Sequence, residues 1–235
     1  MKLRIFKLLI KTDKPLYAHA ASLRGFIGRQ FQYLELLHNH SFDNSLMYIY
    51  PRIQYQILDE HALILGIEEG VDTVKLIESM LLQLSLKGVV YNIIEKTGTE
   101  NYFEFGVINS QTPYSFITPW LALNEKNYEK YRKFGNWNKK KEMLEKILIG
   151  NIISMSKSLG YTVPEPIIAN IGKLKEVNAS LKGNPMIGFL GDFSVNFEIP
   201  DYWGIGKSVS RGFGTIKRVN ELKSLGVKEL GDGEN

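Results

Sequence analysis

The chain has 235 residues, a formal net charge of +4, and 44% apolar and 23% charged residues. This composition is typical of a globular protein and excludes a disordered or collagen-like chain, and the length suits one large domain or two smaller ones. Because the chain has no cysteine, a disulfide, a thiolate metal site and a cysteine nucleophile are all excluded.

The charge is distributed unevenly along the chain. Residues 1–30 carry +6 and residues 126–146 carry +5, whereas residues 57–104 carry −6. Basic blocks attract a polyanion such as nucleic acid, although solvated helix faces also collect lysine. Lys7 interrupts the apolar N-terminal stretch, and no later segment is long and apolar enough to span a membrane, so we expect a cytoplasmic protein without a membrane partner.

The first hundred residues predict six elements in chain order. These are a strand over 3–10, a helix over 22–37, strands over 48–58 and 62–67, and a helix that begins after Asp72 and ends at Gly88. The last element is extended over 89–94 and 102–108, with a hairpin turn at Thr97-Gly98. The order strand, helix, strand, strand, helix, strand is that of a ferredoxin-like unit.

The second half begins in a similar way. Residues 114–118 predict a strand, residues 126–159 predict a helical stretch interrupted near Gly135, and the alternation of Phe193, Val195, Phe197 and Ile199 predicts a strand with one buried face. We therefore expect an α+β protein with two tandem ferredoxin-like (RRM-like) domains, over 1–110 and 111–228, joined near 109–113 and followed by a flexible tail over 229–235.

The sharpest local motif contains two glycine pairs, Gly204-Ile205-Gly206 and Gly212-Phe213-Gly214, with Lys207 and Arg211 between them. Glycine permits positive φ and close approach, so successive amides can face an anion beside the two cations. The spacing matches neither a dinucleotide-binding nor a Walker motif. Two glycine-rich hairpin turns remain an alternative interpretation.

A second motif, His38-Asn39-His40, lies at the predicted end of the first helix. Free carbonyls at a helix end favour protonated histidine and bring its titration near neutral pH, which suits acid–base chemistry, although capping or surface histidines are the alternative. On the following strand, Tyr48 and Arg52 share one polar face, which equally fits an exposed strand. His38, His40 and Asp43 lack a second acidic cluster, so we expect no metal and no cofactor, and we interpret His19 and His61 as structural.

Two ferredoxin-like halves, the early histidines and GIGKSVSRGFG together resemble the CRISPR-associated endoribonucleases that process precursor RNA, the Cas6 family, and Tyr48 after the histidines resembles its archaeal b-type branch. The resemblance implies metal-independent cleavage of CRISPR repeat RNA, in which the ribose 2′-OH attacks the phosphorus and leaves 2′,3′-cyclic phosphate and 5′-OH ends.

The resemblance also implies site residues. Catalysis is assigned to His38 and His40, with Tyr48 as the positioning residue. Many relatives use a lysine here, for which Arg52 is the electrostatic substitute. The remaining RNA-binding candidates are the glycines of the family's loop and nearby cations: Gly204, Gly206, Gly212, Gly214, Lys207, Arg211, Arg24, Arg29 and the Lys139–Lys141 run.

The expected partner is CRISPR repeat RNA within precursor transcripts, and effector-complex proteins and a homodimer are left open. Two other function classes compete with the endoribonuclease. A non-catalytic repeat-RNA-binding subunit of an effector complex would share the fold and the glycine motif, but not the paired histidines. A small-ligand regulatory domain of ferredoxin-like architecture would leave the basic blocks unexplained.

Overall fold

The computed structural model describes residues 1–37 and 49–219. Its N-terminal half is an antiparallel sheet in the strand order β2-β3-β1-β5-β4, and two helices cover one face of that sheet. The elements are β1 (Lys2–Thr12), α1 (Ala20–Gln30), the short 3₁₀ helix η1 (Glu35–Leu37), β2 (Ile53–Leu58), β3 (His61–Ile67), α2 (Gly70–Met80), β4 (Gln83–Leu86) and β5 (Val89–Glu104).

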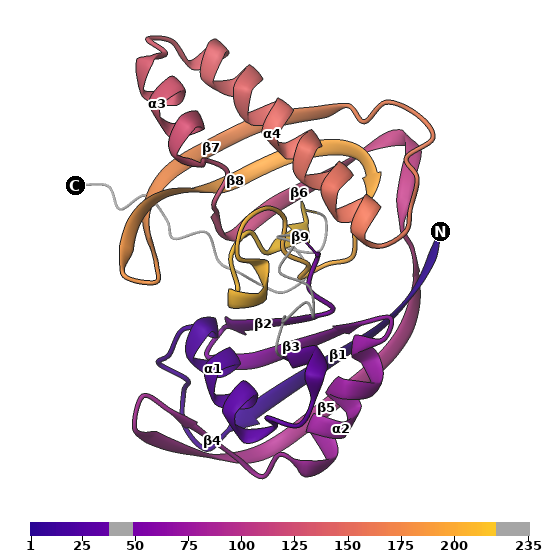
Figure 1. The fold of residues 1–235 in the computed structure, drawn as a ribbon, viewed down its shortest axis with the longest axis vertical. Helices are drawn as coiled ribbons and strands as arrows, with labels where there is room; N and C mark the ends of the chain where they lie inside the picture. Colours follow the sequence, from indigo (N-terminus) through magenta and orange to yellow (C-terminus); the bar gives the residue numbers. More distant parts are fainter. Residues whose placement is uncertain (38–48, 220–235) are drawn as a thin grey trace, which may run out of the picture.

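The C-terminal half repeats this arrangement, except that a loop replaces one helix. Its antiparallel sheet has the strand order β7-β8-β6-β9, and the long helix α4 covers one face (Figure 1). A loop over 199–215 containing the 3₁₀ helix η2 takes the place of the second helix. The elements are β6 (Gly106–Trp120), α3 (Glu125–Lys133), α4 (Trp137–Ser158), β7 (Ala169–Leu181), β8 (Asn184–Glu198), η2 (Val209–Arg211) and β9 (Ile216–Arg218). The expectation of two tandem ferredoxin-like units in an α+β protein is confirmed.

The two halves share a hydrophobic core. One face of the N-terminal sheet packs against α1 and α2, whereas the opposite face, with Leu3, Ile5 and Leu65, belongs to the same buried cluster as the C-terminal half. Phe105 lies between the halves, and its ring centroid is 4.9 Å from that of Phe197. Because β3 is buried on both faces, its sequence after His61 is apolar throughout rather than alternating.

The hairpin turn predicted at Thr97-Gly98 is wrong. β5 runs through this position without interruption, and Gly98 lies opposite Leu8 of β1. The turn lies instead at Lys87 and Gly88, both at positive φ, and connects β4 to β5. Glycine is needed at 98 for packing, because a Cβ there would lie 2.5 Å from the Phe6 ring and 2.6 Å from the Glu78 carboxylate.

Other predicted boundaries also change. The helix expected over 22–37 ends at Gln30, and the helix expected to reach Gly88 ends at Met80, because 83–86 form the unpredicted strand β4. Strand β7 was also not predicted. Residues 109–113, the expected junction, lie inside β6, and the tail over 229–235 lies outside the described residues.

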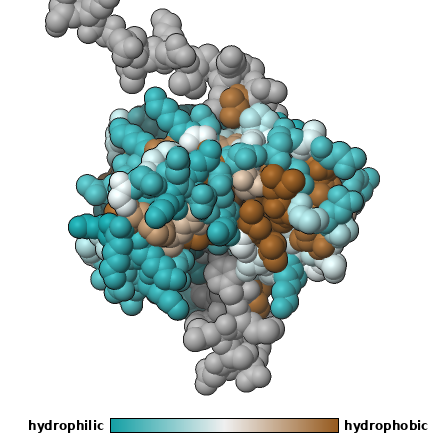
Figure 2. Space-filling view, turned by 90° about the horizontal axis from the view of Figure 1, so that it is seen from above, coloured by the Kyte–Doolittle hydropathy of each residue, from teal (hydrophilic) through white to brown (hydrophobic). Residues whose placement is uncertain are grey.

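No helix in the described part of the chain is long and apolar enough to cross a membrane. The face of the molecule on the side of α3 and α4 is mostly hydrophilic, and its apolar residues gather mainly in the area on the right of the view (Figure 2). The homodimer therefore stays a prediction, since nothing in the structure shows what covers that area.

Candidate RNA-binding and catalytic site

The glycine loop, defined here as residues 204–214, lies between the two halves (Figure 1). Its chain reverses direction through Gly206, Ser208, Gly212 and Gly214, which all have positive φ. At Gly212, a Cβ would lie 2.6 Å from the Ala20 Cβ at the start of α1. Glycine therefore lets the loop lie directly against the N-terminal half.

The backbone amides of this loop are largely engaged within the protein. Gly204 N donates to Gln54 Oε1 at 2.9 Å, and Gly214 N donates to Pro119 O at 2.9 Å. Gly212 N donates to Val209 O at 3.0 Å. RNA contact at these three glycines would therefore not use their N–H groups. The strand residue Gln54, which the sequence places on the same polar face as Arg52, fixes the position of the loop.

A surface pocket of about 500 Å³ lies where α1 meets the end of the glycine loop. We call it the arginine pocket, and its main lining residues are Arg24, Gly25, Gly28, Arg29, Leu37 and Arg211. Gly25 and Gly28 lie on one face of α1. Because they have no side chains, they leave a depression in the surface of the helix at this point. Three of the predicted RNA-binding residues, Arg24, Arg29 and Arg211, are thus brought together from opposite halves.

The arginine pocket is strongly electropositive. Burial and the positive charge of Arg211 lower the pKa of the Arg24 guanidinium from its usual value. Among the described residues that line the pocket, none is an aspartate or a glutamate. Arginine nevertheless remains protonated at neutral pH, so two neighbouring guanidinium groups repel each other. A bound phosphate would relieve this repulsion and accept their hydrogen bonds.

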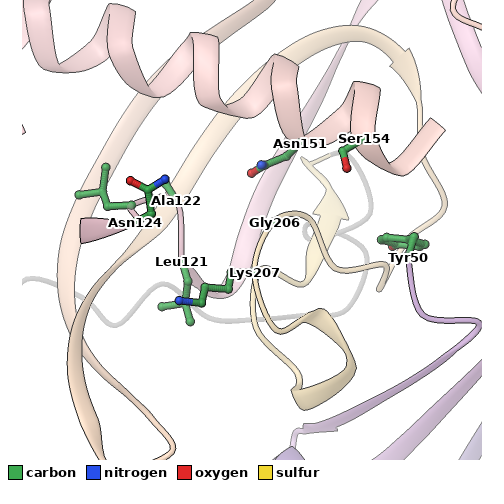
Figure 3. Close-up of a pocket in the computed structure, with 9 residues that line it drawn as sticks. Tyr50, Leu121, Ala122, Asn124, Asn151, Ser154, Gly206 and Lys207 are labelled. Atoms are coloured by element: carbon green, nitrogen blue, oxygen red, sulfur yellow. The ribbon is translucent and has the colours of Figure 1, made fainter. Parts of the chain in front are cut away.

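Lys207 is exposed at a second pocket, on the other side of the glycine loop. This α4 pocket has a volume of about 240 Å³ and lies between α4 and the loop (Figure 3). Its main lining residues are Tyr50, Leu121, Leu123, Asn151, Ser154 and Lys207. Sequence reasoning missed Asn151 and Ser154. The available signal was a pair of polar residues three apart in the otherwise apolar run Leu148–Met155.

Arg52 is turned into the protein. Its Nε donates to Glu69 Oε1 at 2.5 Å, its Nη2 donates to Ser158 O at 3.0 Å, and its side chain is 17% exposed. It is not among the residues that line either pocket. The face predicted on this strand points inward, since Tyr50 OH donates to Gly204 O at 2.8 Å. Arg52 therefore connects the two halves and is not brought together with the other cations.

The predicted catalytic residues His38, His40 and Tyr48 lie outside the described residues, as does Asp43. The described chain stops at Leu37, which lines the arginine pocket, and resumes at Ile49, next to Tyr50 of the α4 pocket. Across residues 1–37 and 49–219, no three histidine or acidic side chains are grouped to hold a metal ion.

The Lys139–Lys141 run at the start of α4 is partly paired with acids. Lys140 Nζ lies 3.7 Å from Glu176 Oε1 and 4.4 Å from the centre of the Tyr131 ring, and Lys141 Nζ lies 3.8 Å from Glu145 Oε1. Neither pocket includes these lysines among its lining residues. They lie apart from the three arginines.

Family models match both halves of the chain. The model of the Cas6b N-terminal domain matches residues 1–104, and the model of the Cas6b C-terminal domain matches residues 106–219. The chain belongs to the Cas6b family. A curated relative, uncharacterized protein MJ0978 of Methanocaldococcus jannaschii, is 50% identical over 139 residues, which cover 59% of this chain and 94% of that protein.

Solved structures agree with this assignment. A crystal structure of Cas6b is 38% identical, with a TM-score of 0.85, and covers 93% of this chain and 100% of that chain. A CRISPR RNA processing endoribonuclease Cas6b is 35% identical, with a TM-score of 0.72 and the same coverage. A Cas6-related protein from Pyrococcus furiosus, at 15% identity and a TM-score of 0.54, shares the fold.

Proposed function

We propose that this Cas6b protein is an endoribonuclease that cuts CRISPR repeat RNA in precursor transcripts and needs no metal ion. The observation that carries the proposal is the arginine pocket, where Arg24, Arg29 and Arg211 meet with no acidic residue among the described lining residues. Leu37 of the same pocket directly precedes His38. A solved Cas6b relative is a CRISPR RNA processing endoribonuclease, which supports the same activity here.

The proposed reaction is an internal transesterification. A base removes the proton of the ribose 2′-OH, and the resulting oxygen attacks the adjacent phosphorus. The bond from phosphorus to the 5′ oxygen breaks, and an acid returns a proton to that oxygen. The products are a 2′,3′-cyclic phosphate and a 5′-OH. The attacking oxygen comes from the substrate itself, so no water and no metal-bound hydroxide takes part in the cleavage.

His38 and His40 are the proposed acid and base, and Tyr48 is the proposed positioning residue. The guanidinium groups of Arg24 and Arg211 would hold the phosphate and stabilise its charge as the attacking oxygen bonds to it. Arg29, which is exposed at the edge of the pocket, would contact a neighbouring phosphate. The protein would thus supply proton transfer from one segment and charge stabilisation from both halves.

The test is cleavage of the repeat RNA from the same genome in the presence of EDTA. We expect fragments with cyclic phosphate and 5′-OH ends, and no cleavage of RNA with a 2′-deoxy group at the scissile position. His38→Ala and His40→Ala should each slow single-turnover cleavage by about 10² to 10⁴-fold with RNA affinity retained. His19→Ala, an exposed histidine before α1, is the matched control.

Three results would count against the proposal. Loss of cleavage on chelation in a pure preparation would contradict the metal-free mechanism. Tight RNA binding without any product would favour the non-catalytic subunit. Unchanged rates in both histidine variants would place catalysis on other residues.

A further inference from the structure

The end of α4 carries a polar face directed toward the glycine loop and residue 50. Asn151, Ser154 and Ser158 follow one another at helical spacing on this face. Asn151 Oδ1 accepts from Trp120 Nε1 at 3.2 Å, and Ser158 Oγ accepts from Tyr50 N at 2.7 Å. Within the described chain, the Ser154 hydroxyl and the Asn151 amide nitrogen have no hydrogen-bond partner. Both side chains are partly exposed and line the α4 pocket, so these two groups are available to a ligand.

The glycine loop forms the opposite wall of the α4 pocket. A Cβ on Gly206 would lie 2.7 Å from Trp120 Nε1 and 3.0 Å from Asn151 Oδ1, and its φ is +93°. Only glycine therefore allows the loop to lie this close to α4. Figure 3 shows Asn151 and Ser154 projecting from α4 on the side of the helix that faces the glycine loop, and Lys207 projecting from that loop.

The lining favours a nucleotide over a bare anion. Leu121 and Leu123 provide an apolar wall, and a phosphate alone would leave that wall without a partner. Asn124 uses its Oδ1 to accept from Asn127 N, so its amide nitrogen, like that of Asn151, remains a donor. A nucleobase has apolar faces and acceptor atoms on its edge, and its own phosphate would lie near a cation. None of the lining residues in the described part of the chain is acidic.

We propose that the α4 pocket binds one unpaired nucleobase of the RNA. The base inserts between the apolar wall and α4, its acceptor atoms face Asn151 and Ser154, and Lys207 binds its phosphate. This inference depends on the proposed function and deepens it, because the arginine pocket contacts only phosphate, which carries no sequence information, whereas a base pocket reads one position.

The experiment is an abasic scan of an uncleavable repeat RNA that carries a 2′-deoxy group at the scissile position. Binding of the wild-type chain should weaken about tenfold at one scanned position, where the pocket loses its base. Ser154→Phe, which fills the pocket, should weaken binding of intact RNA by about the same factor and abolish the penalty at that position only. Ser154→Ala, a smaller change, should reduce the penalty without removing it.

Lys157→Ala is the matched control, since Lys157 is exposed on the same helix and does not line the pocket. Its abasic profile should equal that of the wild type, and thermal melting should show that all variants are folded. If the Ser154 variants retain the wild-type profile while the wild-type chain cuts repeat RNA in EDTA, this inference is overturned and the proposed function stands. If the wild-type chain neither binds nor cuts the RNA, both are overturned.

Discussion

At the scale of single residues, the site depends on cations for which residues 1–37 and 49–219 supply no ion pair. Arg24 is partly buried on α1 and lies close enough to Arg211 for that charge to lower its pKa. In contrast, Arg52 contacts Glu69 and a backbone carbonyl, although it carries the same charge. A protein keeps like charges together at a cost in stability, and an anionic ligand offsets that cost. The cluster of Arg24, Arg29 and Arg211 is therefore more informative than the total count of basic residues.

Replacement of Arg24 tests this distinction. Arg24→Gln should weaken binding of repeat RNA about tenfold, because a charge-assisted contact to phosphate is lost, and should reduce the slope of log K against log salt by about one. The measurement is a binding titration at several salt concentrations. Lys87→Gln, in the exposed turn before β5, is the control and should change neither quantity. A salt slope in Arg24→Gln equal to that of the wild type would show that Arg24 does not contact phosphate.

At the scale of elements, a loop in place of a helix creates the site. In the N-terminal half, α2 covers its sheet, whereas in the C-terminal half the equivalent connection is the glycine loop. The loop brings Arg211 against α1 on one side and Lys207 near α4 on the other. A helix has its backbone groups satisfied internally, but this loop depends on Gln54 and Pro119 as partners. Its shape is therefore fixed by both halves.

Gly88 and Gly212 have nearly equal φ but different surroundings. Alanine substitutions at these two positions therefore distinguish the cost of backbone strain from the cost of a steric clash. Gly212 has φ +83°, and a Cβ added there would lie 2.6 Å from the Ala20 Cβ. Gly88 has φ +80°, and a Cβ added there would have no other atom within 4 Å. Gly88→Ala should therefore cost only the conformational penalty, about 1 kcal/mol, or a melting temperature lower by about 3 °C. Gly212→Ala should lower the melting temperature at least twice as much and also weaken RNA binding, because Arg211 moves. Equal shifts in the two variants would contradict close packing of the loop on α1.

The order of elements could be predicted from the sequence because apolar periodicity is local. The GIG and GFG pairs were also visible, since glycines beside cations form a local pattern. Gly98 was misinterpreted as a turn, because a glycine required for contact with Phe6 and Glu78 looks the same in sequence as one required for a turn. The meeting of Arg24 with Arg211 could not be predicted, since it depends on how the halves pack. Polar residues on a helix usually indicate a solvent-facing side, so Asn151 and Ser154 were overlooked.

At the scale of the whole molecule, the two halves form one folding unit, because they share a hydrophobic core. Leu3, Ile5 and Leu65 of the N-terminal sheet are 0–1% exposed only because the C-terminal half covers them. Two side chains of the N-terminal half also bind the backbone of Gly204: the Tyr50 hydroxyl donates to Gly204 O, and Gln54 Oε1 accepts from Gly204 N. The arginine pocket has walls from both halves, so its geometry requires that they keep a fixed relative position. Cooperative unfolding is the thermodynamic consequence of this construction.

The tryptophans permit a direct test of that cooperativity. Trp120, Trp137 and Trp203 all lie in the C-terminal half, so their fluorescence reports its unfolding. Ile64→Ala removes a side chain that is 0% exposed in the core beneath α1 and α2 of the N-terminal half. It should cost about 2–5 kcal/mol and lower the melting temperature by roughly 10 °C. We expect tryptophan fluorescence and far-UV circular dichroism to shift together, because the shared core couples the halves.

Leu82→Ala, at a residue 81% exposed, should shift neither signal. An unshifted fluorescence transition in Ile64→Ala would show that the halves unfold independently, and the arginine pocket would then have no fixed shape in the absence of RNA.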